Sequence, residues 1–530
     1  MERFLEDERV LVGSLVLLCF LLYILNLGNA SLSGKHEALY AGVAREMFVD
    51  GNWTIPHFDG QIYTEKPPLY FWMVALCSLP IGDVNEFTAR LPAALCAMGT
   101  VIVTFFLGRK LFNTRAAFLG ALILATCVLF VVSGRRVRLD TAFTFFISSS
   151  LLAFYSGYIS NKKTYYFLLF WFLVALAVLT KGLFALFLVI CPIALYLFLS
   201  GDLKVLVETR FLFGFSAFIL TIAAWLLLAY EQDGGDYIKQ FVFVNSGLSY
   251  IIPLTEAKHH HSLLRYTIGY FFLGMLPWSI FLLVFFYRFF SKGLWKQNRQ
   301  LLFPGVWFFG MLFIFILMGQ KRATYYLPIY PPAALLIATW WDDSIGASPN
   351  VQSPWLLKGL ECFTVVILGA ATVWACQGVS SREIILCAFT VLLILGLGYF
   401  FVYSRRFKEL FIFIFLIAVS TGVSYNQIFV PREKKSVLRQ GFYKELNSIL
   451  GTCTTLALYG HGLDYKEILF YSKKRLKIIN SVDELEEFFR SGVQVYCLMT
   501  QKNYSQLSST VDMHLVKELP AEKLLLVSNK

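Results

Sequence analysis

Long apolar runs separated by short polar segments dominate the chain. A run of about 20 apolar residues is long enough to cross a bilayer as a helix, and we count about thirteen such runs. They begin near Val10, Arg90, Ala116, Thr141, Thr164, Leu183, Leu206, Tyr266, Leu301, Thr324, Trp355, Glu383 and Leu410. The pattern predicts an all-α membrane domain over residues 1–430.

The apolar stretch Pro68–Gly82 is too short to be a span, because it has only about 15 residues. It predicts an interfacial or re-entrant helix. With this stretch outside the spans, short basic loops such as Lys162-Lys163 and Arg405-Arg406 fall on one side of the membrane. The positive-inside rule makes that side the cytoplasm. The first loop, residues 29–89, and the C-terminal part then face the extracytoplasmic side.

The hydrophobic pattern changes after about residue 431, where shorter runs with strand and helix character alternate. Ser481 and Asp464 are suited to cap helices at their N-termini. The predicted strands are Thr454–Tyr459, Leu476–Ile479, Val493–Met499 and two near Met513–Lys517 and Leu524–Val527, and the predicted helices are Tyr465–Ser472, Val482–Arg490 and one after the third strand. Residues 431–530 therefore predict a small extracytoplasmic α/β domain.

Composition supports a membrane protein over a soluble one. The chain is 57% hydrophobic and only 15% charged, which excludes an ordinary soluble domain. The net charge of +12 does not indicate nucleic-acid binding, because the basic residues form short clusters between apolar runs, as topology signals do. The cysteines have no metal-type spacing, and Cys453 and Cys497 are interpreted as core residues of strands, with a disulfide between them as the alternative.

The polar residues gather in the extracytoplasmic loops. The segment Glu65-Lys66-Pro67-Pro68 cannot lie inside a spanning helix, because proline breaks helices and both charges are costly in hydrocarbon. The middles of the spans carry almost no charge, whereas transporters usually carry ionisable groups there. The pattern favours an enzyme that uses a lipid-borne substrate at the outer leaflet. Loops that only connect spans, and a flippase of lipid-linked sugars, remain the alternatives.

Several cationic side chains lie near carboxylates in these loops, which suits a phosphate-containing substrate. The candidates are His36, Glu37, Arg45, Glu65, Lys66, Asp140, Lys181, His259–His261, Lys321 and Tyr325. Taken singly, each has a simpler explanation. A lysine at a helix end, such as Lys181 or Lys321, often only extends to the membrane surface. Asp140 would cap a helix, and the three histidines would lie in a solvated loop.

Seven segments resemble the bacterial lipid A aminoarabinose transferases and related GT-C glycosyltransferases, which are distant relatives of the protein O-mannosyltransferases. These segments occur in order over roughly residues 30–340. They are Glu37–Met47 with Gly51-Asn52-Trp53, then Tyr63–Tyr70, then Asn85–Pro92, and finally Arg138–Thr141 with Leu179–Gly182 and Lys321–Pro332. The resemblance implies a GT-C fold, and an inverting transfer of a sugar from undecaprenyl phosphate at the periplasmic face of the bacterial inner membrane.

The resemblance also implies roles for single residues. Lys66 would bind the donor phosphate, with help from Arg45, Lys181 or Lys321, and Tyr325 would line the donor pocket. Glu65 would bind a divalent metal, expected to be zinc, together with a histidine of the outer loop Glu231–Arg265, such as His260. Asp140 would be an active-site carboxylate, with Glu37 and His36 as further catalytic candidates. No organic cofactor is expected.

Two positions depart from the family pattern. The family usually has Asp-Glu where this chain has His36-Glu37, and Glu-His followed by Arg-Phe where this chain has Asn245-Ser246 and Ser249-Tyr250.

The acceptor would be lipid A or another outer-leaflet molecule. An ionised phosphate acceptor would need little general-base help, whereas a hydroxyl acceptor would need a base. Transfer of a hexose, hexosamine or mannose to protein or polysaccharide is the alternative, and an inactive binding relative is another.

Overall fold

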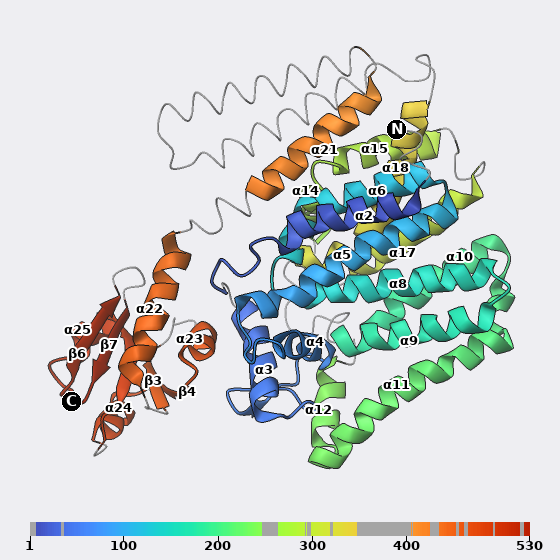
Figure 1. Cartoon of the computed structure of the whole chain (residues 1–530). Coiled ribbons are helices and arrows are strands. Elements are labelled where there is room, and N and C mark those ends of the chain that lie inside the picture. The colour runs from blue at the N-terminus through green and yellow to red at the C-terminus, as the bar shows by residue number, and fades with distance from the viewer. Residues whose placement is uncertain are drawn as a thin grey trace.

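Most of the chain folds as a bundle of long helices, and a separate sheet follows near the C-terminus (Figure 1). The structure is a computed structural model. It describes residues 7–32, 36–245, 263–291, 293, 298–317, 322–346, 404, 406–424, 434–451, 455–460, 465–490, 493–519 and 524–530.

Most of the described bundle helices begin close to a predicted start of an apolar run, and the two that begin at Val128 and Ser279 have no such predicted start. The described bundle helices are α2 (Glu8–Cys19) with the π-helical η1 (Phe20–Ile24), α5 (Glu86–Leu111), α6 (Thr114–Thr126), α7 (Val128–Gly134), α8 (Leu139–Ile159), α9 (Lys163–Lys181), α10 (Phe184–Ser200), α11 (Thr209–Asp233), α14 (Leu263–Gly274), α15 (Ser279–Ser291), α17 (Leu302–Leu317), α18 (Tyr330–Gly346) and α21 (Phe407–Ser424). Short 3-10 helices precede three of them, namely η2 (Leu203–Val207), η4 (Arg299–Leu301) and η5 (Ala323–Ile329).

Within the described residues, 5 helices are long and apolar enough to cross a membrane, or up to 6 if the bent pair α6 and α7 forms one span. The chain is therefore a multi-pass membrane protein. The predicted count of thirteen spans stays a prediction, since the runs near Trp355 and Glu383 lie outside the described residues.

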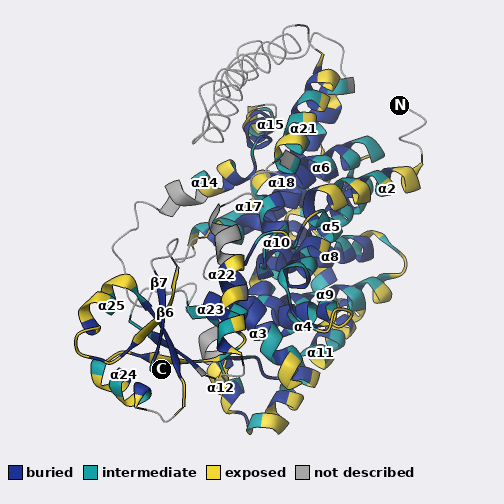
Figure 2. Ribbon diagram, turned by 60° about the vertical axis from the view of Figure 1, so that its left-hand side comes forward, coloured by how far each residue is buried: buried dark blue, intermediate teal, exposed yellow. Residues whose placement is uncertain are grey.

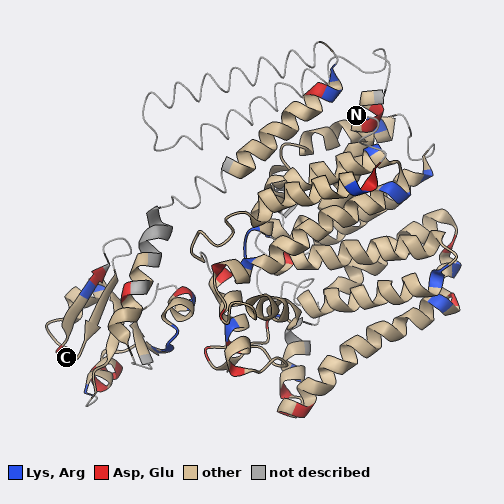
Figure 3. Cartoon of the chain, viewed as in Figure 1, with Lys and Arg blue, Asp and Glu red and all other residues tan. Residues whose placement is uncertain are grey.

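In the bundle, charge is concentrated at the ends of the helices, whose central parts carry other residue types (Figure 3). The buried side chains form a continuous core between the helices (Figure 2). Helices α9 and α11 approach closely at Gly214, where an added Cβ would lie 2.7 Å from the Phe167 carbonyl oxygen. This arrangement leaves the polar chemistry at the helix ends and in the loops, as the sequence predicted.

The first loop is folded rather than extended. It contains α3 (Glu37–Asp50), a hairpin of β1 (His57–Phe58) and β2 (Gln61–Ile62), and α4 (Leu69–Ser78). Helix α4 follows Pro67 and Pro68 directly, where proline is compatible with a helix start. With 10 residues, α4 is too short to cross a bilayer, as expected for the stretch after Pro68.

The C-terminal α/β unit, residues 434–530, is built on a five-stranded sheet in the order β4-β3-β5-β7-β6. Strands β3, β4 and β5 are parallel, and β7 pairs antiparallel with β5 and β6. Its elements are α22 (Lys434–Leu450), β3 (Thr455–Tyr459), α23 (Tyr465–Ser472), β4 (Arg475–Ile479), α24 (Val482–Phe489), β5 (Tyr496–Thr500), α25 (Gln501–Leu507), β6 (His514–Leu519) and β7 (Leu524–Ser528).

Alternation along the strands gives the sheet two buried faces. In β3, Leu456 and Leu458 face α22 and α23, whereas Ala457 packs with the residues of α24 and α25. The predicted strands and helices of this region are confirmed where the structure describes them, and Ser481 caps α24 as expected by accepting a hydrogen bond from the Glu484 amide. Cys497 is a buried free thiol in β5, while Cys453 and Asp464 lie outside the described residues.

Candidate functional site

The centre of the candidate site is an ion pair between the start of α8 and the end of α9. These consecutive helices are joined by a short loop and pack side by side, so the first turn of α8 meets the last turn of α9. Lys181 Nζ lies 2.5 Å from Asp140 Oδ1, and the two side chains are only 13% and 10% exposed. A carboxylate in the first turn also interacts favourably with the helix dipole. The pair is thus a nearly buried, charge-assisted contact.

Aromatic rings enclose the Lys181 ammonium. Its Nζ lies 4.1 Å from the centre of the Tyr325 ring and 5.1 Å from that of Phe143. Tyr325 comes from η5, which packs against α8 and leads into α18. Three residues that the sequence singled out separately, Asp140, Lys181 and Tyr325, therefore lie together. The rings attract the cation through their quadrupoles and exclude water from it.

A second pair of residues joins the first loop to η5. Arg322 Nη1 lies 2.8 Å from His36 Nε2, although 286 positions separate the residues. The His36 ring stacks on Tyr40, with ring centres 5.7 Å apart. Since a guanidinium only donates, the Nε2 atom accepts, and the neutral ring then carries its proton on Nδ1. Nδ1 is buried and makes no hydrogen bond to any residue that the structure describes.

Electrostatics keeps His36 neutral at physiological pH. Burial, followed by the positive charges of Arg322, Arg138 and Lys466, lowers the pKa of His36 from 6.5 to about 4, and Asp140 opposes this only in part. The imidazole is therefore neutral and can serve as a hydrogen-bonding group or a weak base. It does not add a positive charge to the site.

We expect His36 to make the protein less stable as the pH falls from about 6.5 toward 4. In this window the unfolded chain binds a proton that the folded chain rejects, so protonation favours unfolding. Replacement by asparagine, whose carbonyl can still accept from Arg322, should reduce this part of the acid sensitivity. The difference between the melting temperatures in detergent at pH 7.5 and pH 5 measures the acid sensitivity. His514→Asn, at an exposed position on β6, is the control. An equal loss of stability for His36→Asn and wild type would contradict the assignment.

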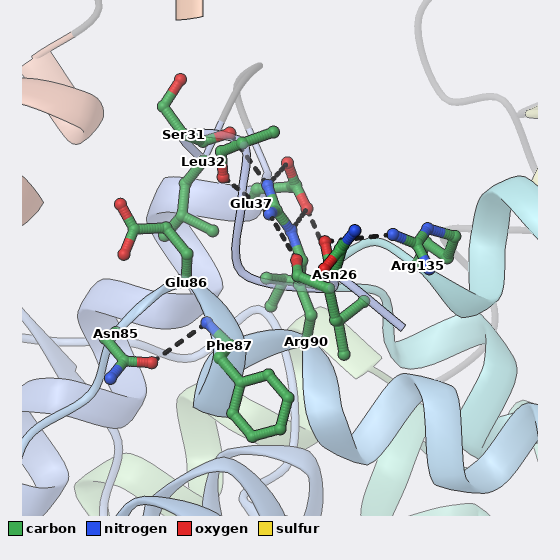
Figure 4. A network of polar contacts seen from close by, with 12 residues as sticks. Asn26, Ser31, Leu32, Glu37, Asn85, Glu86, Phe87, Arg90 and Arg135 are labelled. Atoms are coloured by element: carbon green, nitrogen blue, oxygen red, sulfur yellow. Dashed lines mark hydrogen bonds and ion pairs between the residues drawn. The ribbon is translucent and has the colours of Figure 1, made fainter. Parts of the chain in front are cut away.

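Glu37, predicted to be catalytic, lies in a buried network at the start of α5 (Figure 4). Its Oε1 accepts from Arg90 Nε at 3.2 Å and from the Val137 amide at 2.9 Å, and its Oε2 accepts from Arg90 Nη2 at 3.2 Å. Arg90 also donates to the carbonyl oxygens of Leu27, Ala30 and Ser31. Both Glu37 oxygens are thus engaged. The catalytic role stays a prediction, and these contacts favour a structural one.

Arg45, predicted to bind phosphate, faces the C-terminal α/β unit. Its Nη2 donates to both carboxylate oxygens of Asp83, at 2.8 and 2.7 Å, and its Nη1 donates to the Phe470 carbonyl oxygen at 2.8 Å. The guanidinium also lies 5.4 Å from the centre of the Phe470 ring. Since these groups already take up Arg45, its contacts favour a role in joining the first loop to α23.

The structure does not test the proposed metal site of Glu65 and His260, because His260 lies outside the described residues. Glu65 is exposed and accepts from the Tyr63 hydroxyl at 3.3 Å, while Lys66 is half-buried just before α4. His260 and Lys321 lie outside the described residues. Within the described part of the chain, no three His, Cys, Asp or Glu side chains lie close enough to share a metal ion. Zinc binding by Glu65 and His260 therefore stays a prediction.

Sequence reasoning did not single out Tyr40, Arg322 and Lys466 as site residues, whereas Arg138 belongs to a basic cluster whose place on the outer side suggested phosphate binding. Arg322 directly follows Lys321, which was chosen. Lys466 carried no signal, because it lies in a different predicted domain. Taken together, the site offers cations, a buried carboxylate and a neutral imidazole, which is suited to holding an anionic group and aligning a reaction beside it.

The structure is that of a polytopic helical membrane protein, with its polar site at one end of the helices. The overall fold matches the crystal structure titled ArnT from Cupriavidus metallidurans bound to undecaprenyl phosphate, with a TM-score of 0.78, 18% identity and 99% of each chain covered. At this identity the match establishes the shared fold.

Sequence comparison also finds proteins that are similar to this chain. The profile of the family described as dolichyl-phosphate-mannose-protein mannosyltransferase matches residues 65–228. An uncharacterized protein of Aquifex aeolicus is 30% identical over 324 residues, 61% of this chain and 62% of that protein. The undecaprenyl phosphate-alpha-4-amino-4-deoxy-L-arabinose arabinosyl transferase 1 of Pseudomonas fluorescens is 28% identical over 353 residues, 64% of this chain and 60% of that protein.

These matches confirm the resemblance found in the sequence motifs, namely to aminoarabinose transferases and other GT-C glycosyltransferases. The aligned region spans about three fifths of the length of these curated relatives.

Proposed function

We propose that this protein is a glycosyltransferase that moves a sugar from undecaprenyl phosphate to an acceptor at the periplasmic face of the inner membrane, with inversion. Lipid A is the first acceptor to test. In this proposal the chain has about thirteen spans, and the first loop and residues 431–530 face the periplasm. The observation that carries the proposal is the Asp140–Lys181 pair under Tyr325, beside His36 and Arg322, in a chain similar to aminoarabinose transferases.

The chemistry follows from the charge that develops on the leaving phosphate. As the acceptor attacks the anomeric carbon, the bond to the donor phosphate oxygen breaks and negative charge grows there. Lys181, held by Asp140, would stabilise this charge in a site where water is excluded. Lys66 and Lys321 are proposed as further phosphate ligands. Glu65 and His260 are proposed as the metal ligands by resemblance alone, and no step of this mechanism depends on them.

The acceptor decides whether a base is needed. A phosphate on lipid A is already largely ionised near pH 7, since the second pKa of such groups is about 6. A hydroxyl of a protein or polysaccharide would need a base, and the neutral His36 is available for that role. Transfer of a hexose, hexosamine or mannose to a hydroxyl acceptor is therefore the second candidate function.

A flippase or transporter of lipid-linked sugars fits the structure less well. Among the described residues, the buried charged side chains are Glu37, Arg90, Asp140, Asp342 and Glu467. Those in bundle helices lie near the helix ends: Arg90 and Asp140 near the starts of α5 and α8, and Asp342 near the end of α18. A substrate path through the membrane usually places ionisable groups at mid-depth.

The proposal predicts that lipid A from cells with the wild-type protein carries a sugar-sized mass increment that cells without the gene lack. An Asp140→Asn variant of normal abundance should not restore this increment, because Lys181 then loses the carboxylate that holds it. Mass spectrometry of lipid A from the three strains measures this. If lipid A is unchanged in all three while a labelled sugar reaches protein or polysaccharide, the second candidate function is supported. If Asp140→Asn restored the mass increment, the assignment of the Asp140–Lys181 pair to the active site would be contradicted.

A further inference from the structure

Helix α23 of the C-terminal α/β unit packs directly on the loop that carries His36. Tyr465 at its start contacts Phe58 of the first loop, with ring centres 6.0 Å apart. Near its end, the Phe470 carbonyl and ring hold Arg45 of α3. Lys473, which follows the helix, donates to Asp83 at 2.7 Å, and Asp83 also binds Arg45. The α/β unit is thus attached along most of α23 through polar and aromatic contacts.

Tyr471 binds the first loop at Leu32, four residues before His36. Its hydroxyl accepts from the Leu32 amide at 2.7 Å and donates to Glu86 Oε1 at 3.1 Å. Burial, reinforced by the charge of Glu86, raises the pKa of Tyr471, so the hydroxyl stays protonated and keeps both contacts. Leu32 and Glu86 both belong to the region around Arg90 that Figure 4 shows.

Contacts within the α/β unit hold Tyr471 in place. Its ring stacks on Tyr443 of α22, with ring centres 4.6 Å apart and planes 13° from parallel. Its backbone carbonyl accepts from the Asn447 side chain at 2.8 Å. Since α22 provides both contacts, the position of the Tyr471 hydroxyl is set by the core of the α/β unit rather than by the first loop.

From Leu32 the chain leads to the site within a few residues. On one side of His36, Arg90 binds the carbonyl oxygens of Leu27, Ala30 and Ser31. On the other side, Glu37 binds Arg90 and the Val137 amide. In the sequence His36 therefore lies between two segments that Arg90 and Glu37 hold, and Tyr471 binds Leu32, the residue next to the first segment. The same helix carries Lys466, whose charge also acts on the His36 ring.

We propose that the C-terminal α/β unit is a working part of the site, and that Tyr471 is a positioning residue that fixes the His36 segment for binding of the lipid phosphate. This inference rests on the proposed function, because it takes undecaprenyl phosphate as the ligand. It assigns a role to residues 434–530 that the bundle helices do not provide: α23 completes the wall of the site and keeps the first loop in its binding conformation.

The test compares Tyr471→Phe with Tyr504→Phe in the full-length protein in detergent. Tyr504 lies on α25 and packs on the opposite face of the same sheet, so it is a matched control. Tyr471→Phe should raise hydrogen exchange in residues 30–50 roughly tenfold, because the Leu32 amide loses its buried partner. It should also weaken binding of undecaprenyl phosphate roughly 3- to 10-fold, as the binding-competent fraction falls. Tyr504→Phe should change neither quantity.

Lys473→Ala provides a second variant, because this lysine is 57% exposed and its loss should not prevent folding. It should raise exchange around residues 83–88. If exchange in Tyr471→Phe rises only within residues 434–530, or if residues 30–50 loosen while lipid affinity is unchanged, the positioning role is overturned. If the wild type itself binds no undecaprenyl phosphate, the proposed function is overturned, and the exchange result still decides whether α23 fixes the His36 segment.

Discussion

Replacing Lys181 by methionine is expected to lower the rate of sugar transfer at least about 10²–10³-fold. That is the typical cost of removing one preorganised group that stabilises charge in a transition state. The Lys181 ammonium is held by Asp140 at 2.5 Å and covered by the Tyr325 ring at 4.1 Å, so water cannot replace it well. The initial rate of transfer from undecaprenyl-phosphate sugar, divided by the amount of folded protein, measures the effect.

The single replacement also leaves Asp140 as an unpaired buried charge, which costs about 3–5 kcal/mol of stability. The double variant Lys181→Met/Asp140→Asn removes both charges and separates folding from function. If the pair only supports the fold, the double variant should fold and keep its transfer rate. Under the proposed mechanism it folds and stays inactive. Lys163→Met/Glu208→Gln, which removes a pair that is 28% and 32% exposed at the other end of α9, is the matched control and should keep transfer near the wild-type rate.

The Asp140, Lys181 and Tyr325 cluster could be anticipated from the sequence because the hydrophobic pattern fixes where helices begin and end. A short loop makes α8 and α9 antiparallel neighbours, so a residue at the start of one lies near the end of the other. Tyr325 lies at the start of the apolar run that is predicted to begin near Thr324. The order of spans alone therefore places these three residues at one end of the bundle.

Pairing between distant segments could not be anticipated in the same way. His36 and Arg322 are 286 positions apart, and no periodicity relates a loop residue to a partner that far along the chain. Arg45 shows the same limit. Its type and place suggested phosphate binding, yet its partners are a carboxylate 38 positions away and a backbone carbonyl 425 positions away. The sequence shows that a cationic side chain is present, whereas the fold determines which groups already bind it.

Replacing Arg90 by methionine is expected to destabilise the protein by about 3–5 kcal/mol, the usual cost of breaking a buried ion pair by removing one partner. Its side chain is 5% exposed and that of Glu37 is 2% exposed. The change would leave Glu37 charged without its cation, and it would remove the donor for three carbonyl oxygens. Arg90→Lys should not restore stability, because an ammonium cannot reproduce the planar fork. Denaturant unfolding in mixed micelles measures the loss.

Two variants turn this prediction into a test of Glu37. Arg490→Met removes a cation that is 80% exposed from an i,i+4 pair on α24, and it should cost about 0.3–0.5 kcal/mol at most. If Arg90→Met were no less stable than that control, the structural role of the pair would be wrong. Arg90→Met/Glu37→Gln should be more stable than Arg90→Met, since no unpaired charge remains and the glutamine oxygen still accepts from the Val137 amide. The transfer rate of folded Glu37→Gln protein then decides whether Glu37 is catalytic. A residue that only holds the His36 segment tolerates this change, whereas a catalytic carboxylate does not.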